Sequence, residues 1–179
     1  MKTKTNQTKR QQAFTIIEVM IVLAIAALIL LVVFLAVPAL QRSQRNNARK
    51  SDASRIAAAL VDFTSSNQGA LPKTTSTTDC NTVYNSAATL SQLTGLTCNV
   101  TALATGAAPA ANTFYVQNTT YAAPATPSGA NPNAVILVEG NTCSGGSAST
   151  ATGATSTSMA LLYTLESGNT YSFGCVSPQ

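Results

Sequence analysis

Residues 14–40 read FTIIEVMIVLAIAALILLVVFLAVPAL, and Glu18 is the only ionisable side chain among them. From residue 19 to residue 40 the chain holds 22 consecutive uncharged residues, which as a helix are enough to cross a hydrocarbon core about 30 Å thick. The run is too long for the apolar part of an ordinary export signal, which has about 7–15 residues. It predicts a membrane-spanning helix, and its simplest interpretation is a single-pass anchor or an uncleaved export signal.

Glu18 argues against this simplest interpretation. A carboxylate one turn inside an apolar helix costs roughly 2.5–3.5 kcal/mol on insertion scales, so such a group usually has a partner. The next basic residue downstream is Arg42, which is beyond helical reach. A cut between Ala13 and Phe14 would create an α-ammonium group four residues before Glu18. This group could pair with Glu18 of the same chain, and helical geometry makes Glu18 of a neighbouring subunit at least as plausible a partner. Two such charges in a medium of low dielectric would pair strongly and specify the axial register of packed helices.

The segment KRQQAFTIIEVMIVLAIAALIL, residues 9–30, resembles the class 3 signal of type IV prepilins and pseudopilins. That signal has a basic leader, a small residue, an aromatic-Thr-aliphatic-aliphatic-Glu start and a long apolar helix. The resemblance implies that a prepilin peptidase cuts after Ala13 and N-methylates Phe14, and that Glu18 is the family's charge-pairing acid. Removing 13 of the 179 residues would leave 166. The family usually has Gly before the cut, and Ala is the next smallest side chain.

The net charge of +4 belongs to the predicted leader, residues 1–13. The leader has four basic residues and no acid, and beyond it six basic residues balance six acids. A basic cluster directly before an apolar run is held on the cytoplasmic side of a membrane. We therefore expect the part after the run to lie outside. Because that part is neutral, the sequence gives little support to nucleic-acid binding.

After the apolar run the helical pattern continues in amphipathic form. Apolar side chains recur at three- and four-residue spacing and predict a stripe that faces a core. The stripe consists of Ala53, Ile56, Ala57, Leu60 and Phe63. Gly69, followed by Leu71 and Pro72, supplies a stop, so the helix is expected to run from about residue 15 to 67.

Pro38 predicts a kink near the end of the apolar run, because proline removes one helical hydrogen bond. The resemblance implies that the helix also loosens near such a proline when it is packed in a filament. In this chain the proline lies a few residues later than in many relatives.

Arg42, Arg45 and Arg49 share another face of the helix. The simpler interpretation of this arginine row is a solvated surface. The alternative is a set of charged contacts to neighbouring subunits or to lipid headgroups. Asp52 follows Arg49 by three residues, which is the spacing of an intrahelical ion pair.

The four cysteines all lie beyond the apolar run, and none forms a CxxC pair. Because the chain has no His, a Cys/His zinc site is excluded. An even number of cysteines in an exported segment predicts two disulfides, for which three connectivities exist. We favour Cys80–Cys98 and Cys143–Cys175, since each would staple a neighbouring loop-rich stretch at a gain of about 3 kcal/mol.

The exported part is expected to be an irregular region, residues 70–112, followed by strands. The stretch 82–96 suggests one short helix, with Leu90 and Leu93 packing inward. Alternating or apolar runs predict strands at 113–117, 134–139, 159–166 and 170–176, the last two joined by a turn. The low-complexity stretch 141–158 is expected to be a mobile loop. The predicted fold class is α+β: a long N-terminal helix packed against a small antiparallel sheet, as in type IV pilins.

Few residues of this chain are candidates for a catalytic role. Without His, the Ser-His and Cys-His nucleophile pairs are absent. Glu139 and Glu166 are expected on adjacent strands, where acids are usually solvated rather than paired for hydrolysis. There is no phosphate-binding or dinucleotide motif and no metal-ligand cluster, so we predict no catalytic residue, cofactor or metal. Asn99-Val100-Thr101 and Asn118-Thr119-Thr120 match the N-glycosylation pattern, which has many false positives.

These observations predict a structural subunit of a type IV pilus. The expected parts are a leader (1–13), a transmembrane or filament-core helix (14–40), an amphipathic continuation (41–68) and an exported domain (69–179). Its expected partners are the prepilin peptidase, the pilus-assembly machinery and further copies of itself in a helical filament. The precursor would lie in the cytoplasmic membrane and the assembled subunit in an extracellular pilus. The alternatives are a minor pilin, a pseudopilin of a type II secretion or DNA-uptake system, and a membrane-anchored adhesin that never polymerises. The sequence does not separate roles in adhesion, twitching motility, DNA uptake and secretion.

Overall fold

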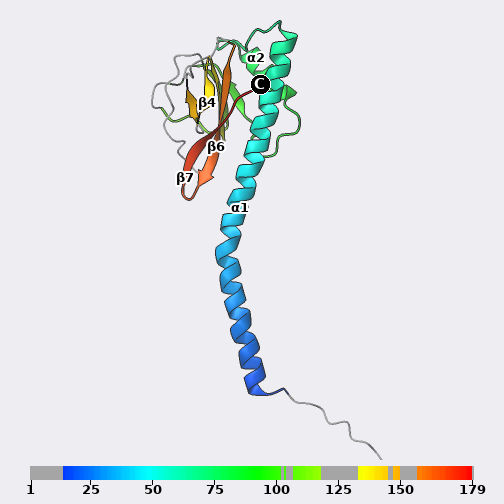
Figure 1. Ribbon diagram of the computed structural model, residues 1–179, viewed down its shortest axis with the longest axis vertical. Helices are drawn as coiled ribbons and strands as arrows, with labels where there is room; N and C mark the ends of the chain where they lie inside the picture. The colour runs from blue at the N-terminus through cyan, green and yellow to red at the C-terminus, as the bar shows by residue number, and fades with distance from the viewer. Residues whose placement is uncertain are drawn as a thin grey trace, which may run out of the picture. The chain divides into compact units, whose positions relative to one another are not determined.

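The computed structural model describes residues 14–101, 103, 107–117, 133–144, 147–149 and 157–178. The elements are α1 (Ile16–Ser66), α2 (Thr77–Ser86), β1 (Thr97–Asn99), β2 (Thr113–Gln117), β3 (Ala134–Glu139), β4 (Thr142–Ser144), β5 (Ser147–Ser149), β6 (Met159–Ser167) and β7 (Thr170–Val176). Figure 1 traces them along the chain. Two compact units divide the chain between Gln41 and Arg42, so α1 contributes to both. The fold class is α+β, as the sequence predicts.

The second half of α1 provides one wall of the core. Its bounds agree with the predicted ones to within one residue at each end. Of the predicted stripe, Ala53, Ile56, Ala57 and Leu60 are buried and Phe63 is partly buried. The helix ends where Gln68 and Gly69 take positive φ angles of 58° and 85°, which stop helical hydrogen bonding.

The five-stranded sheet has the order β1-β2-β3-β6-β7 and is mixed, not wholly antiparallel as predicted. The four predicted strands all form, but β2 and β3 run parallel, with Thr113 opposite Ala134. The short strand β1, which was not predicted, adds a second parallel pair. Parallel neighbours need a long crossover. The 16 residues between Gln117 and Ala134 are numerous enough for the chain to return to the same end of the sheet.

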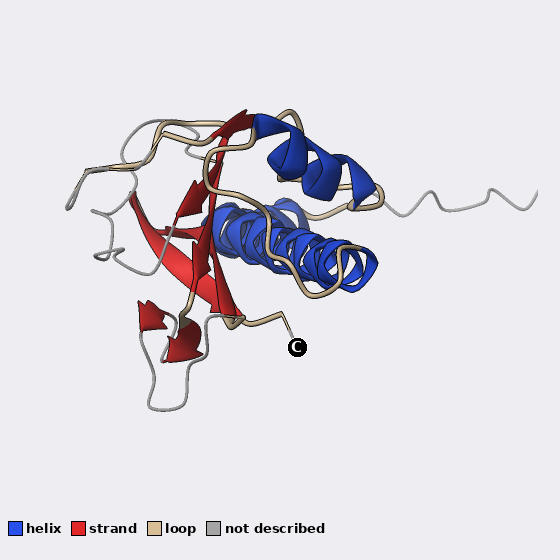
Figure 2. Cartoon of the chain, turned by 90° about the horizontal axis from the view of Figure 1, so that it is seen from above, coloured by secondary structure: helices blue, strands red, loops and turns tan. Residues whose placement is uncertain are grey.

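Both faces of the sheet are covered. Figure 2 shows α1 and α2 on the same face, where side chains such as Phe114, Leu137 and Leu161 pack against them. The opposite face has a smaller cluster around Ile136 and Leu162, with Ala148 of β5 packed against it. A sheet buried on both sides explains why all of β2 and the first five residues of β3 are buried without polar alternation.

Two local predictions need correction. The short helix forms at 77–86, earlier than predicted, because Ser76 caps it: the Ser76 hydroxyl accepts a hydrogen bond from the Asp79 N–H at 3.1 Å. Leu93 is nevertheless buried and Leu90 partly buried. The stretch 141–158 is not wholly a loop, since β4 and β5 form an antiparallel ladder within it. The remainder, 145–146 and 150–156, lies outside the described residues.

Gly174 permits a close approach between the two C-terminal strands. It lies opposite Tyr163 on the neighbouring strand. A Cβ atom at this position would come within 2.5 Å of the tyrosine ring. Tyr163 therefore fills the space that a larger residue would need, and its burial raises the pKa of the phenol.

Candidate functional site

The described residues of the first unit expose their apolar side chains. The exposed fraction of the large ones ranges from 42% at Val37 to 85% at Phe14. The most apolar stretch of 18 residues has a mean hydropathy of 3.4, and none of it is buried. One helix in the described part of the chain is therefore long and apolar enough to cross a membrane. An apolar surface of this extent is unusual on a soluble monomer and is typical of a surface that contacts lipid or other apolar helices.

Glu18 has a partner within its own chain. The backbone N–H and the hydroxyl of Thr15 both donate to Glu18 Oε2, at 3.2 and 3.0 Å, and Glu18 N–H donates back to the Thr15 hydroxyl at 3.3 Å. This reciprocal arrangement is a capping box at the first turn of α1. The pattern T-x-x-E at residues 15–18 is the sequence signature of that motif, so Thr15 was recognisable from the sequence alone.

Of the other residues that the sequence singles out near the N-terminus, Phe14 and Pro38 lie in the described part of the chain. Ala13 and the rest of the predicted leader lie outside the described residues, whereas Phe14 is described and exposed. Pro38 lies inside α1, which is helical on both sides of it. Cleavage at Ala13, methylation of Phe14, charge pairing through Glu18 and a kink at Pro38 stay predictions.

The arginine row is not simply a solvated face. Arg45 binds the carboxylate of Glu166 at 3.0 Å from Nε and 2.6 Å from Nη2. Arg49 is buried, and its Nη1 lies 2.8 Å from the same carboxylate in an ion pair. The Asn46 amide bonds the backbone of Glu166 on both sides, donating to its carbonyl at 2.9 Å and accepting from its N–H at 2.8 Å. We call Arg45, Asn46, Arg49 and Glu166 the α1–β6 clamp.

The predicted intrahelical pair between Arg49 and Asp52 is wrong. Asp52 is buried, and its Oδ2 accepts three consecutive backbone N–H groups, from Ser91 at 2.9 Å, Gln92 at 2.6 Å and Leu93 at 2.9 Å. Three aligned donors satisfy a buried carboxylate better than a neighbouring side chain on the same helix could. Asp52 therefore fixes the loop after α2 to α1.

Glu139 and Glu166 do lie on adjacent strands, but at opposite ends. Glu139 is opposite Met159 of β6, and Glu166 is seven residues further along that strand, about 24 Å at 3.4 Å per residue. Hydrogen bonding to Arg45 and the charge of Arg49 lower the pKa of Glu166. Desolvation raises the pKa of Glu139 to about 7. Two carboxyl groups so far apart cannot act as a hydrolytic pair.

Glu139→Gln is expected to flatten the dependence of stability on pH between about pH 4.5 and pH 7. Because the folded pKa of Glu139, about 7, lies above its ordinary value of 4.5, the wild-type chain should lose stability as the pH rises through this range. The variant cannot titrate there and should be the more stable protein above pH 7. Urea denaturation at a series of pH values measures the effect. A wild-type slope in the variant would contradict it, and Asp62→Asn, at an exposed site, is the control.

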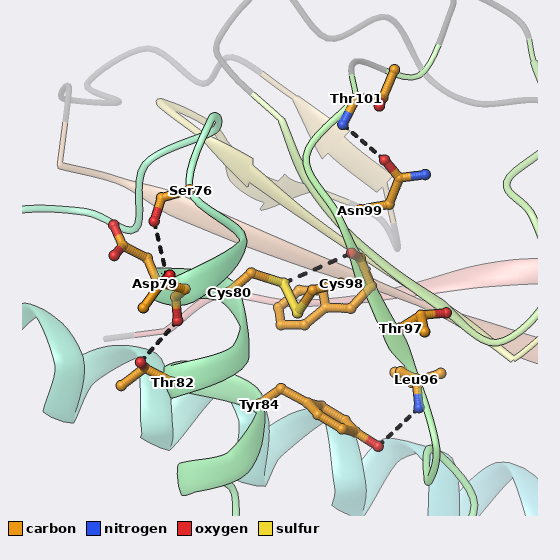
Figure 3. Close-up of a disulfide and its surroundings, with 12 residues drawn as sticks. Ser76, Asp79, Cys80, Thr82, Tyr84, Leu96, Thr97, Cys98, Asn99 and Thr101 are labelled. Atoms are coloured by element: carbon orange, nitrogen blue, oxygen red, sulfur yellow. Dashed lines mark hydrogen bonds between the residues drawn. A yellow bond between two sulfur atoms is a disulfide. The ribbon is translucent and has the colours of Figure 1, made fainter.

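The structure joins Cys80 to Cys98 and Cys143 to Cys175. Figure 3 shows the first of these bridges between α2 and β1, with the Tyr84 hydroxyl accepting a hydrogen bond from the Leu96 N–H at 3.1 Å nearby. Asn99, in the first glycosylation pattern, uses its Oδ1 to accept the Thr101 N–H at 2.8 Å. The second pattern, 118–120, lies outside the described residues. Within the described residues no three His, Cys, Asp or Glu side chains gather as metal ligands.

Comparison with known proteins identifies one feature. The family model described as the prokaryotic N-terminal methylation motif matches residues 8–34. No curated protein and no solved structure matches the chain. The matched segment includes Ala13, Phe14 and Glu18 and extends well into the exposed apolar helix. This prepilin-type motif supports a type IV pilin-like or pseudopilin protein.

Proposed function

We propose that this chain is a structural subunit of a type IV pilus. A prepilin peptidase would cut after Ala13 and methylate Phe14, and the membrane pilus-assembly machinery would then build mature subunits into a helical filament. The observation that carries the proposal is the match of the methylation motif to a segment that continues into an exposed apolar helix. Copies of that helix would bury one another in the filament, which is a structural task and not an enzymatic one.

Before assembly the precursor would be a single-pass protein of the cytoplasmic membrane. The basic leader would remain on the cytoplasmic side, and the unit that begins at Arg42 would lie outside. The two disulfides of that unit suit an oxidising compartment.

Glu18 would direct the assembly of the processed subunit. Both hydrogen bonds from Thr15 go to Oε2, so Oε1 is open to an α-ammonium group. The Phe14 ammonium of a neighbouring copy could therefore bind without breaking the capping box. The capping box would in turn hold the carboxylate in one position, which lowers the entropy lost on pairing.

The N-terminus of the protein in sheared filaments tests the proposal. Mass spectrometry is expected to find N-methylated Phe14 as the first residue, in a chain of 166 residues after loss of the first 13. Another N-terminus would contradict the processing step. A chain that keeps its leader and fractionates only with membranes would instead support an anchored adhesin.

Glu18→Ala is expected to reduce filament yield by roughly tenfold or more while leaving cleavage largely intact. A tenfold loss needs only about 1.4 kcal/mol, and removing one partner of a buried ion pair costs about 3–5 kcal/mol because the other charge is left uncompensated. Immunoblots of sheared and cell-bound fractions measure yield and cleavage separately. The control is Asp62→Ala, an exposed acid on the same helix. Filaments at wild-type yield in Glu18→Ala would exclude the pairing role.

A minor pilin or a pseudopilin is the second candidate, because the matched motif supports either assignment. The abundance of the protein in sheared filaments separates these two assignments from a major subunit. A major subunit should dominate sheared filaments, whereas a minor pilin should be a small fraction of them and a pseudopilin should be nearly absent. Quantitative mass spectrometry of the filament preparation gives that ratio.

A further inference from the structure

The α1–β6 clamp is the first place along α1 where the helix is fastened to the sheet. The buried residues of α1 begin at Arg49, and the buried apolar ones only at Ala53. Arg45 and Asn46 lie further toward the N-terminus and already bind Glu166, about 120 residues away in sequence. The fastening therefore begins with polar contacts, within a few residues of where the second unit starts at Arg42.

We propose that this clamp is the joint through which tension passes from α1 into the sheet of the exported unit. The inference rests on the proposed function, because only a subunit anchored through its N-terminal helix is pulled in this way. A pull applied to the outer unit is resisted at the anchored end of α1, so the tension crosses Arg42 before it reaches the core. The clamp meets that tension ahead of the apolar stripe.

The geometry of the clamp suits it to resist force. Its bonds all converge on one residue, Glu166, so they share a load and must break together. The apolar contacts from Ala53 to Leu60 follow one another along the helix and could separate one turn at a time. Breaking the clamp also leaves Arg49 buried without its acid, which is a costly intermediate.

On the sheet side of the clamp, β6 is held by its neighbouring strands, one of which carries a disulfide. β6 pairs with β7 as far as Glu166 and beyond it, where Glu166 lies opposite Tyr171, and with β3 further along the strand, from Met159 to Tyr163. The Asn46 amide holds the backbone of Glu166, and not only its side chain. The disulfide Cys143–Cys175 connects β7 covalently back to β4, which prevents the last strand from being drawn out alone. Tension delivered to Glu166 is thus spread over the sheet.

Pulling on single molecules tests the inference. The full chain, in a detergent micelle with its disulfides intact, is held by handles at its two ends in an optical trap. The first rupture is expected to release α1 from the sheet. Glu166→Gln, which keeps the size of the side chain and removes its charge, should raise the rate of this rupture at fixed force by about tenfold. Arg45→Gln, which spares the buried Arg49–Glu166 pair, should raise it by a smaller factor.

A core substitution away from the clamp separates mechanical from general weakening. Ile136→Val, on the opposite face of the sheet, should lower the thermal midpoint yet leave the rate of first rupture at its wild-type value. A wild-type rupture rate in Arg45→Gln and Glu166→Gln would overturn the inference. So would an equal acceleration in Ile136→Val. If Glu166→Gln does not fold, the partly exposed Arg45 site still decides the question.

The outcome is independent of the filament experiment. An unprocessed N-terminus would contradict the proposed function but would not change how a single molecule ruptures. Conversely, filaments with N-methylated Phe14 and a clamp that bears no load would leave the pilus proposal standing and remove only this inference.

Discussion

Glu166→Ala is expected to lower the free energy of unfolding of the unit that begins at Arg42 by about 3–5 kcal/mol, the usual cost of removing one partner of a buried ion pair. The Arg49 side chain is only 3% exposed, so without Glu166 its charge would be buried without an acid. The Asn46 contacts to the Glu166 backbone can persist, which is why the effect falls mainly on the ion pair. Chemical denaturation of the detergent-solubilised chain, followed by circular dichroism, measures the loss.

The pH dependence of this effect provides a second measurement. The pKa of Glu166 is lowered by Arg45 and Arg49, so its contribution is complete above the ordinary value of 4.5 and is lost as the pH falls through the folded pKa. The difference between wild type and Glu166→Ala should therefore shrink in acid. A gap that stays constant down to about pH 2 would show that the ion pair is not its source. Asp62→Ala, which removes an exposed acid, should change stability little at any pH.

Asp52→Ala is expected to cost at least about 3 kcal/mol. The substitution removes the acceptor of three backbone N–H groups, and each buried donor left without a partner costs about 1–3 kcal/mol. The loop that Asp52 holds carries the buried Leu93, so part of the core would loosen with it. Urea denaturation gives the loss, and hydrogen exchange of the amides at 91–93 locates it.

Asp52→Asn separates the hydrogen bonds from the charge. All three N–H groups bind the same atom, Oδ2, and an amide oxygen can occupy that position. The amide nitrogen would then face the Ser91 hydroxyl, which can accept a hydrogen bond. We therefore expect Asp52→Asn to lose clearly less stability than Asp52→Ala. Equal losses in the two variants would mean that the charge, and not the set of hydrogen bonds, holds the loop.

Features encoded by contiguous residues could be predicted. The apolar helix, its amphipathic continuation and the four main strands each follow from a pattern within a short window, because hydropathy and periodicity are local properties. The capping box of Thr15 and Glu18 belongs to the same class. Its spacing is visible in the sequence, but Thr15 is not a basic residue and so is missed when only a charged partner for Glu18 is considered.

Features that depend on competition between distant partners could not be predicted. Arg49 and Asp52 have the spacing of a helical ion pair, yet each has a better partner elsewhere in the fold. Burial decides the competition, since a buried charge is stabilised only by partners with good geometry. The direction of β2 relative to β3 is of the same kind. Strand propensity marks where strands form, but the path of the connection decides whether neighbours run parallel.

The N-terminal segment of this protein can be recognised from its residues in order: a basic stretch, then a lone acid in a helix whose apolar side chains are unfavourable in water. These properties belong to the side chains in order and need no folded partner to be recognised. The convergence of Arg45 and Arg49 on Glu166, by contrast, appears only in the folded chain. That convergence requires β6 to lie beside α1 across about 120 residues of chain, and no spacing within the helix encodes it. The order of the side chains is enough to predict the apolar helix, whereas packing decides which residues hold the second half of α1 to the sheet.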